Sequence, residues 1–267
     1  IDRLGKLAYS AFRSRLFGPE DIFYMSPTQS AIVHGQNVFD ATSTLSNLKF
    51  AISNWSDGAS ELTVYLVGEA SNGLLQVNET ESLIPTDLGR WLNNYQNGGQ
   101  QLNVVMEFSG SGDYLPVLTP LAGEPRIVVG TSPFLRESIL TLGLSFSDFF
   151  YSDVAAGLTW GQAIRSARRK VRHASGNVRQ KVILDDNGNG IPNEKDIDGL
   201  NADTVPVGRS SGQDYPIFGL VTTFSSIPDP KVTNLTLFAS SITDEDGIRE
   251  SWVEVTSPTN SLGQPSE

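Results

Sequence analysis

The chain has 267 residues, of which 39% are hydrophobic and 18% are charged, and its formal net charge is −11. This composition supports the packed core of one large domain, or of one domain plus part of another, and argues against a mainly disordered chain. The acidic excess disfavours binding to nucleic acids and to anionic membranes, and the absence of cysteine excludes disulfides, thiolate metal sites and a thiol nucleophile.

The first 60 residues predict two helices separated by a polar stretch. Apolar residues recur at helical spacing over residues 4–16, and the Gly-Pro pair at 18–19 ends this helix. The segment DIFYMS (21–26) predicts a short strand, and the polar residues 26–43 predict a loop. A second amphipathic helix is expected after Thr44, which is a candidate N-cap.

Three apolar runs of β-forming residues then alternate with further helical patterns. Because buried strands that alternate with helices build parallel sheets, the sequence predicts an α/β fold whose central sheet is largely parallel and covered on both faces. The strand candidates are ELTVYLVG (61–68), QLNVVMEF (101–108) and RIVVGTS (126–132), and the helix candidates are 86–99, 145–158 and 160–174.

The composition changes after about residue 184. A run of Asp, Asn and Gly covers 184–203, and YPIFGLVTTF (215–224) is a candidate last strand. We therefore expect a main domain over residues 1–226. Residues 227–267 are expected to form a linker and a β-rich segment, which is either the start of a truncated Ig-like sandwich or a docking or donor extension.

Several of these segments, taken together and in this order, resemble a known family. The segments LTVYLVGEASNG, LNVVMEFSGSGDYL, RIVVGTSP, LSFSDFFYSDVAAGLTWGQA and LDDNGNG are similar to parts of the caspase-like cysteine peptidases of the legumain type, in particular the large secreted bacterial versions. The resemblance covers roughly residues 3–200. It implies a caspase-like three-layer αβα sandwich, followed here by a C-terminal β segment.

In that family a histidine base follows the first of these strands and a cysteine nucleophile follows the second, while backbone N–H groups of the turns hold the oxyanion. This chain has Glu69 at the histidine position and Ser109 at the cysteine position, with a phenylalanine where an alanine usually precedes the cysteine. The corresponding oxyanion turns, which we regard as degenerate, contain Gly68, Ala70 and Gly110.

The chemistry of the two replaced positions predicts that no reaction is catalysed. A serine hydroxyl needs an adjacent base to become a nucleophile, and a carboxylate such as Glu69 is a poor base for an alcohol. The only histidines, His34 and His173, lie in a polar loop and at the end of a charged helix. We therefore expect a pseudopeptidase that acts as a structural, assembly or binding module. The alternatives are a residual hydrolase that uses Ser109, and a peptide-binding regulatory pseudoenzyme.

The stretch DDNGNGIPNEKD fits the spacing of a calcium-binding loop. In that interpretation the carbonyl of Ile191 lies between side-chain ligands, and Gly190 provides the sharp turn. The other expected ligands are Asp185, Asn187, Asn189 and Asp196. The competing interpretation is a plain Asn-Gly turn with solvated acidic residues, because these residue types favour turns in any case.

The sequence also indicates a cellular location and a class of binding partner. No apolar run reaches about 18 residues, so no membrane span is predicted. The lack of cysteine, the calcium loop and the resemblance favour an extracellular or cell-surface protein with a protein partner or self-assembly.

The resemblance also implies a strand that the chain does not supply at its start. Caspase-like domains usually open with an apolar strand in the middle of the sheet, whereas this chain opens on a helix. We expect the vacant position to be filled by upstream sequence or by a strand donated by a neighbouring subunit, with residues 230–257 as a candidate donor. A complete sheet built from residues 1–225 alone would contradict both expectations.

Overall fold

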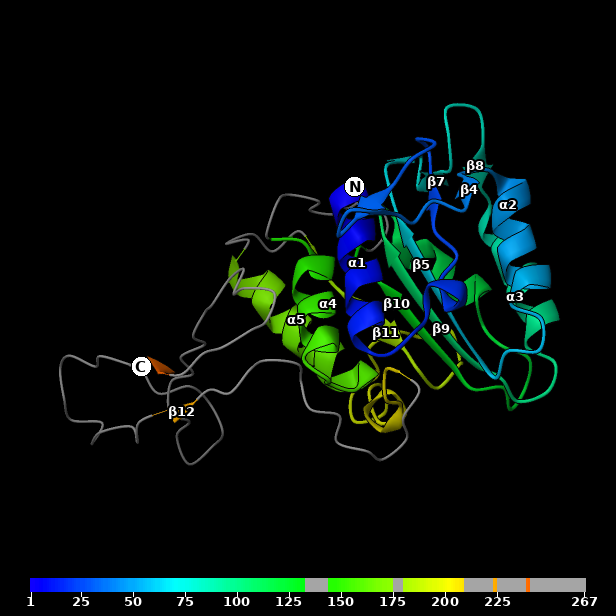
Figure 1. The fold of residues 1–267 in the computed structure, drawn as a ribbon. Helices are drawn as coiled ribbons and strands as arrows, with labels where there is room; N and C mark the ends of the chain where they lie inside the picture. Colours follow the sequence, from blue (N-terminus) through cyan, green and yellow to red (C-terminus); the bar gives the residue numbers. More distant parts are fainter. Residues whose placement is uncertain (133–143, 175–179, 209–222, 225–238, 241–267) are drawn as a thin grey trace, which may run out of the picture. The chain divides into compact units, whose positions relative to one another are not determined.

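The computed structural model describes residues 1–132, 144–174, 180–208, 223–224 and 239–240 (Figure 1). The chain divides into two units, Ile1–Gln213 and Asp214–Glu267. In the second unit, the described residues form one short antiparallel pair, β12 (Thr223–Phe224) with β13 (Ala239–Ser240). β12 is the end of the candidate last strand 215–224, and β13 lies in the predicted β-rich segment 227–267. The remaining residues of both lie outside the described residues.

The first unit is a mixed α/β structure whose main sheet has the strand order β11-β10-β9-β5. Strands β5, β9 and β10 run parallel, and β11 pairs antiparallel with β10. The sheet is therefore mixed and only partly parallel, because β11, a strand that was not predicted, runs opposite to the three predicted strands. The strands are β5 (Glu61–Val67), β9 (Gln101–Glu107), β10 (Arg126–Gly130) and β11 (Ile183–Asp185).

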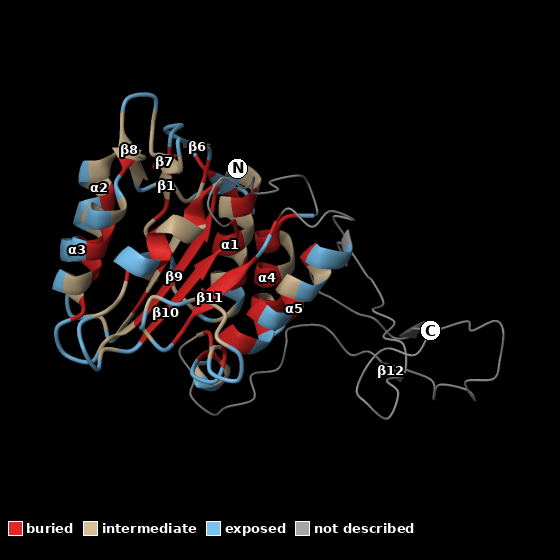
Figure 2. Ribbon diagram, turned by 180° about the vertical axis from the view of Figure 1, so that it is seen from behind, coloured by how far each residue is buried: buried red, intermediate tan, exposed pale blue. Residues whose placement is uncertain are grey.

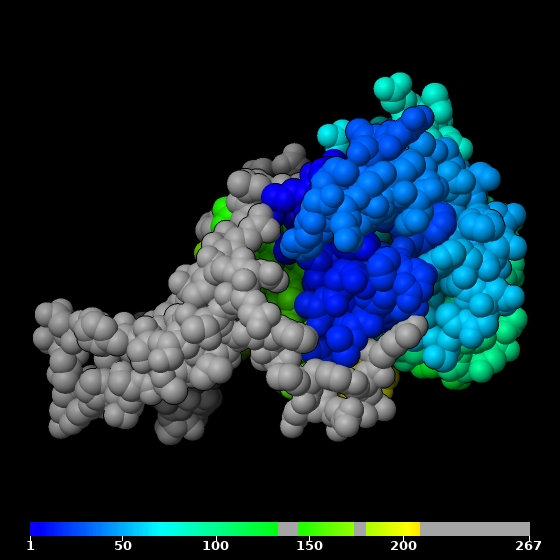
Figure 3. Space-filling model, viewed as in Figure 1, coloured from blue at the N-terminus to red at the C-terminus, as the bar shows by residue number. Residues whose placement is uncertain are grey.

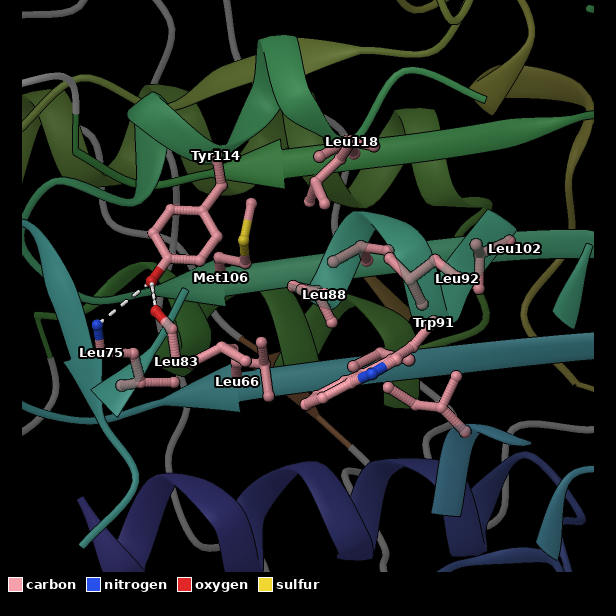
Figure 4. Packing of buried hydrophobic residues seen from close by; sticks show 14 of the residues in the cluster. Leu66, Leu75, Leu83, Leu88, Trp91, Leu92, Leu102, Met106, Tyr114 and Leu118 are labelled. Atoms are coloured by element: carbon pink, nitrogen blue, oxygen red, sulfur yellow. Dashed lines mark hydrogen bonds between the residues drawn. The ribbon is translucent and has the colours of Figure 1, made fainter. Parts of the chain in front are cut away.

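The side chains of β9 alternate between two buried clusters on the two faces of the sheet. Leu102, Val104 and Met106 belong to one cluster, and Val105 belongs to the other. Figure 4 shows the first cluster, in which Leu88, Trp91 and Leu92 of helix α3 (Pro85–Tyr95) pack against the strands. Strands β9, β10 and β11 are buried along nearly their whole length, as Figure 2 shows in red, whereas β5 alternates between buried and half-buried residues.

Three helices contribute to the second cluster. Helix α1 (Asp2–Ser14) provides Ala8 and Ala11, helix α4 (Phe146–Ala155) provides a group of aromatic residues, and helix α5 (Trp160–Ala174) provides Trp160 and Ile164. The three helices lie on the same side of the sheet in Figure 1. All three helices were predicted from the sequence, α1 from the helical spacing of its apolar residues.

Helix α1 ends two residues earlier than its apolar pattern predicted. Leu16 has a φ of 69°, in the left-handed region, and its side chain is 44% exposed. A leucine in this conformation cannot continue a right-handed helix, so the helix ends at Ser14.

Four strands of two residues each lie between Met25 and Thr42. The first is the end of the segment 21–26 that was predicted as a strand, and the other three lie in the stretch that was predicted as a loop. The first and last of them pair in parallel, and the middle two form an antiparallel hairpin. The N-terminal segment that includes them covers much of the face shown in Figure 3, in blue. They are β1 (Met25–Ser26), β2 (Ile32–Val33), β3 (Gln36–Asn37) and β4 (Ala41–Thr42).

The second predicted helix begins where its N-cap was expected. The Thr44 side chain accepts a hydrogen bond of 3.1 Å from the Asn47 N–H, which satisfies one of the free donors at the start of α2 (Leu45–Phe50). A π-helical turn over Ala51–Trp55 extends the helix. The predicted face of this helix is buried at Leu48 and Ile52.

Candidate functional site

The turns after β5 and β9 begin side by side. Val67 pairs with Glu107 at the end of the parallel ladder. The Gly68 N–H then donates to the Glu107 carbonyl, with the nitrogen and oxygen 3.4 Å apart. Glu69 and Ser109, which the resemblance predicts to replace a catalytic pair, therefore follow neighbouring strands at the ends where open α/β sheets commonly place their sites.

The first turn continues into a hairpin that the sequence analysis missed. Ala70 pairs with Leu75, so it is part of strand β6 (Ala70–Ser71) opposite β7 (Leu74–Gln76), and Glu69 is exposed just before it. The two residues between the strands are Asn72 and Gly73, both with positive φ. An Asn-Gly pair between apolar residues is a strong hairpin signal, and it could have revealed this element.

A third short strand completes this small sheet and is anchored by a buried tyrosine. Strand β8 (Ser82–Leu83) pairs with β7. The Tyr114 hydroxyl donates to the Leu83 carbonyl at 2.6 Å and accepts from the Leu75 N–H at 3.2 Å (Figure 4). Because Tyr114 lies in the 3-10 helix Ser111–Val117 that follows β9, it ties the two turns together.

The second turn is closely packed around Gly110. Its φ of +82° lies in the left-handed region, and a Cβ atom added there would come within 2.9 Å of the Gly73 Cα. The preceding Phe108 is fully buried and makes an edge contact with the Tyr114 ring, with 5.0 Å between the ring centroids. Phe108 is therefore part of the core next to Ser109.

The end of β10 is held against the same turn. The Ser111 hydroxyl accepts hydrogen bonds from the N–H groups of Thr131 and Ser132, at 3.0 and 3.2 Å. The Gly112 N–H donates to the Ser132 carbonyl at 2.7 Å. The N–H groups of Gly68, Gly112, Thr131 and Ser132 all donate hydrogen bonds within the protein. These four groups are therefore not available to stabilise an oxyanion.

The two histidines lie on other elements. His34 is exposed in the turn between β2 and β3, and its Nε2 is 3.2 Å from the Ser10 hydroxyl of α1. His173 is exposed in the last turn of α5.

A buried carboxylate lies two residues before Ser109. Glu107 is fully buried and accepts hydrogen bonds from the N–H groups of Phe146 and Ser147, at 2.8 and 3.1 Å, at the start of α4. Burial raises the pKa of Glu107 to about 7, although these hydrogen bonds act in the opposite direction. The helix N-terminus favours a negative charge here. Sequence reasoning missed this role, although a glutamate inside an apolar run was a visible signal.

Two tyrosines surround this carboxylate. The Tyr65 hydroxyl is 2.7 Å from the Ser147 hydroxyl, and the Tyr65 and Tyr151 rings are in edge contact at 4.9 Å. Burial, followed by the charge of Glu107, raises the pKa of both tyrosines well above the ordinary value. The Tyr151 hydroxyl is buried and has no hydrogen-bond partner in the part of the chain that the structure describes.

The Asp/Asn/Gly loop lies at the opposite end of the parallel strands, after β11. The Asp185 carboxylate accepts the N–H groups of Gly188 and Gly190, at 2.8 and 2.7 Å. The amide groups of Asn187 and Asn189 both donate to Glu194. The loop thus brings four of the five expected calcium ligands into one turn, and Asp196 is exposed further along the chain with a φ of 64°.

Two further aspartates of the stretch 184–203 lie outside the predicted ligand set. Asp186 is buried and accepts the N–H groups of Gly199 and Ala202, at 2.9 and 2.7 Å. Asp198 Oδ1 is buried and, within the described residues, has no hydrogen-bond partner. An orphaned carboxylate oxygen beside other acidic groups is compatible with a cation. However, no group of three or more His, Cys, Asp or Glu residues has metal-binding geometry among the described residues.

A cavity of about 380 Å³ borders the acidic loop and is also lined by residues 120–126. Arg126 is buried at its wall, where its guanidinium donates to Gln96, Asn93 and the Leu118 carbonyl. Burial lowers the pKa of Arg126 to about 10, and the arginine remains a cation at neutral pH. All three acceptors are neutral, so this cation is held by hydrogen bonds in a polar wall of the cavity.

Comparison with known proteins adds no relative. None of the protein-family models matches the sequence, and no curated protein matches it either. The class that the structure defines is therefore a mixed α/β domain with a partly parallel sheet, and the legumain-type resemblance stays a prediction. In the part of the chain that the structure describes, no helix is both long and apolar enough to cross a membrane.

Proposed function

We propose that the chain is a non-catalytic, caspase-like pseudopeptidase domain of a secreted or cell-surface protein, where it acts as a structural, assembly or binding module. One observation carries this proposal. The two neighbouring strand ends that would hold the catalytic pair are followed by Glu69 and Ser109, and the whole sequence contains no cysteine.

The arrangement of the elements supports the fold part of the proposal. The mixed sheet has one buried cluster on each face, with α3 in the first and α1, α4 and α5 in the second. A three-layer αβα sandwich of the caspase type would have helices on both faces in this way. The antiparallel β11 and the small sheet β6-β7-β8 are compatible with this fold class.

The contacts of the two turns support the loss of activity. Glu69 is an exposed carboxylate, and exposed carboxylates are weak bases for a serine hydroxyl. The N–H of Gly68 is engaged by the Glu107 carbonyl, and the N–H of Gly112 by Ser132. The site therefore lacks both an effective base and freely available donors at these two positions.

The test is turnover of a broad peptide library, combined with labelling by serine-directed probes. We expect no cleavage above background and no label on Ser109. Specific cleavage that disappears in Ser109→Ala would contradict the proposal and support a residual hydrolase. Peptide binding without cleavage that is lost in Glu69→Lys would support a regulatory pseudoenzyme.

We also propose that the loop at Asp185, Asn187, Asn189, Ile191 and Asp196 binds calcium. The support is its oxygen-rich spacing and the orphaned Asp198 oxygen nearby. Two of the expected side chains are neutral amides, which points to modest affinity of the kind suited to extracellular calcium. Bound calcium would neutralise acidic groups that otherwise repel one another.

A further inference from the structure

Helix α5 has a buried apolar side and an exposed basic side. Its sequence, WGQAIRSARRKVRHA, contains four arginines, one lysine and no acidic residue. The apolar side packs into the second buried cluster through Trp160, Ala163, Ile164, Ala167 and Val171. By the helical period, Arg165, Arg169 and Arg172 project from the opposite side, and all three are exposed. Figure 2 shows the exposed parts of α5 in pale blue.

The four arginines form one continuous basic surface, the arginine stripe, which consists of Arg165, Arg168, Arg169 and Arg172. Residues three and four positions apart are neighbours on a helix, so each arginine lies beside at least two others. The stripe extends for about 10 Å along the helix axis. Burial lowers the pKa of Arg168, and the positive charge of Arg172 lowers this pKa further, while Asp198 acts in the opposite direction. The like charges of the stripe therefore repel one another.

Neighbouring acidic groups compensate only part of this charge. Arg165 forms an ion pair with Asp203 at one end of the stripe. In contrast, Arg169 and Arg172 form no ion pair or hydrogen bond with another described residue. A helix C-terminus favours cations in its last turn, which accounts for Arg172 but not for Arg169. Exposed guanidinium groups therefore remain without an anionic partner in the part of the chain that the structure describes.

We infer that the arginine stripe binds a short acidic segment of a partner protein, with about three Asp or Glu residues within about 10 Å. Arginine presents a planar fork of donors that matches a carboxylate bidentately, and clusters of arginine recognise acidic motifs. The bound carboxylates would also relieve the repulsion among the arginines, so the free energy of the stripe favours an anionic partner.

The charge of the rest of the chain selects a short segment over a long polyanion. The net charge is −11, and α5 alone contains five of the 19 Lys and Arg residues. A nucleic acid or an acidic polysaccharide that extended past the stripe would be repelled by the remaining surface. A second copy of the chain would bring another excess of negative charge. A short acidic segment meets the stripe alone, within a screening length of about 8–10 Å.

This inference goes beyond the proposed function and does not depend on the loss of catalysis, which concerns Glu69 and Ser109. The probe is a fluorescently labelled synthetic peptide in which glutamate alternates with serine, added to the whole chain. We expect saturable binding by fluorescence anisotropy, with a Kd below about 1 mM at low salt. The affinity should fall at least about fivefold between about 0.05 M and about 0.3 M salt, because the ion pairs are exposed to solvent. A control peptide with glutamine in place of every glutamate should not bind.

A matched pair of charge reversals locates the binding surface. Arg169→Glu lies in the stripe, whereas Arg90→Glu changes the net charge equally on α3, where the Arg90 side chain is 66% exposed. We expect Arg169→Glu to weaken binding at least about tenfold and Arg90→Glu by less than about twofold. Arg169→Lys keeps the charge but not the planar fork, so its affinity should be intermediate. Arg169→Gln removes the charge without reversing it and should also weaken binding, which keeps the test valid if Arg169→Glu disturbs the helix; circular dichroism checks the fold.

Four results would overturn the inference. One is that the acidic peptide shows no saturable binding up to about 1 mM. Another is an equal loss of affinity in Arg169→Glu and Arg90→Glu, which would reflect the net charge of the chain and not the stripe. The third is tighter binding of a DNA oligonucleotide or a sulfated polysaccharide than of the acidic peptide, which would make another polyanion the occupant. The fourth is concentration-dependent dimerisation that is lost in Arg169→Glu, which would make a second copy the occupant.

Discussion

The buried Glu107 carboxyl predicts that the protein becomes less stable as the pH rises through neutrality. The folded-state pKa is about 7, against an ordinary value of 4.5, and burial is the largest cause. Between these two values the folded protein keeps the proton while the unfolded chain releases it. The unfolded state then binds fewer protons, so the free energy of unfolding falls with increasing pH.

The size of the effect follows from the separation of the two pKa values. Each pH unit between them lowers the free energy of unfolding by about 1.4 kcal/mol, which gives a full contribution of about 3 kcal/mol. This contribution is fully present below about pH 4.5 and is lost by about pH 7 or slightly above. Between pH 5 and pH 8 we expect a loss of about 2.5 kcal/mol from Glu107.

The variant Glu107→Gln isolates this contribution, because it has nearly the same shape and does not titrate. Asp198, whose pKa is raised to about 6, mainly by burial, titrates in the same direction in both proteins and cancels in the comparison. The measurement is urea unfolding followed by circular dichroism at pH 5, 6, 7 and 8. The difference in unfolding free energy between the two proteins should change by about 2.5 kcal/mol over this range, with Glu107→Gln gaining relative to the unaltered chain as the pH rises.

If the unfolding free energies of the unaltered chain and of Glu107→Gln change with pH by the same amount, the reasoning is refuted. This result would mean that Glu107 titrates at a similar pH in the folded and unfolded states. The N–H groups of Phe146 and Ser147, together with the helix N-terminus, would then fully offset the cost of burying the charge.

Three further predictions concern packing and calcium. Phe108→Ala should lower the free energy of unfolding by about 3–5 kcal/mol, because it leaves a cavity at a fully buried site against Tyr114. Urea unfolding measures this loss, and a value below about 1 kcal/mol would contradict the packing. Gly110→Ala should lower the free energy of unfolding by at least about 1 kcal/mol, because alanine is strained in the left-handed backbone conformation of this position. The clash of the added Cβ with Gly73 should lower it further. An unchanged midpoint of urea unfolding would show that the two turns are not in close contact. Calcium at about 100 times its Kd should stabilise the protein by about 2.7 kcal/mol, with a higher melting temperature that excess chelator reverses. Asp185→Asn should weaken this effect, and an equal melting temperature with calcium and with chelator would count against the site.

The long regular elements of the first unit could be predicted from the sequence, because their signals are local. Helix α1 follows the 3.6-residue period of its apolar residues, and Thr44 caps α2 as its position suggested. The strands β5, β9 and β10 are apolar runs of β-forming residues, which a sequence shows directly. Both faces are buried in β9 and β10, whereas β5 alternates between buried and half-buried residues.

Features that depend on tertiary contacts could not be predicted in this way. The antiparallel direction of β11 depends on how the chain returns after α5, and three residues contain too little pattern to show it. The hydrogen bonds between Glu107 and the start of α4 join residues 39 and 40 positions apart in the sequence, and only the folded structure brings them together. The contact between Gly73 and Gly110 arises in the same way, although each glycine taken alone suggested a turn.

The order in which the sheet can be assembled follows from the pairing of β10 with β11. Gly130 pairs with Ile183, so one side of β10 stays open until the chain beyond α4 and α5 has been made. During synthesis, β5, β9 and β10 can pair while β10 still presents an uncovered edge of buried residues to other nascent chains. Ribosomal pausing or premature termination between residues 130 and 183 would prolong this exposure, and the resulting fragments should be especially prone to aggregation and chaperone binding.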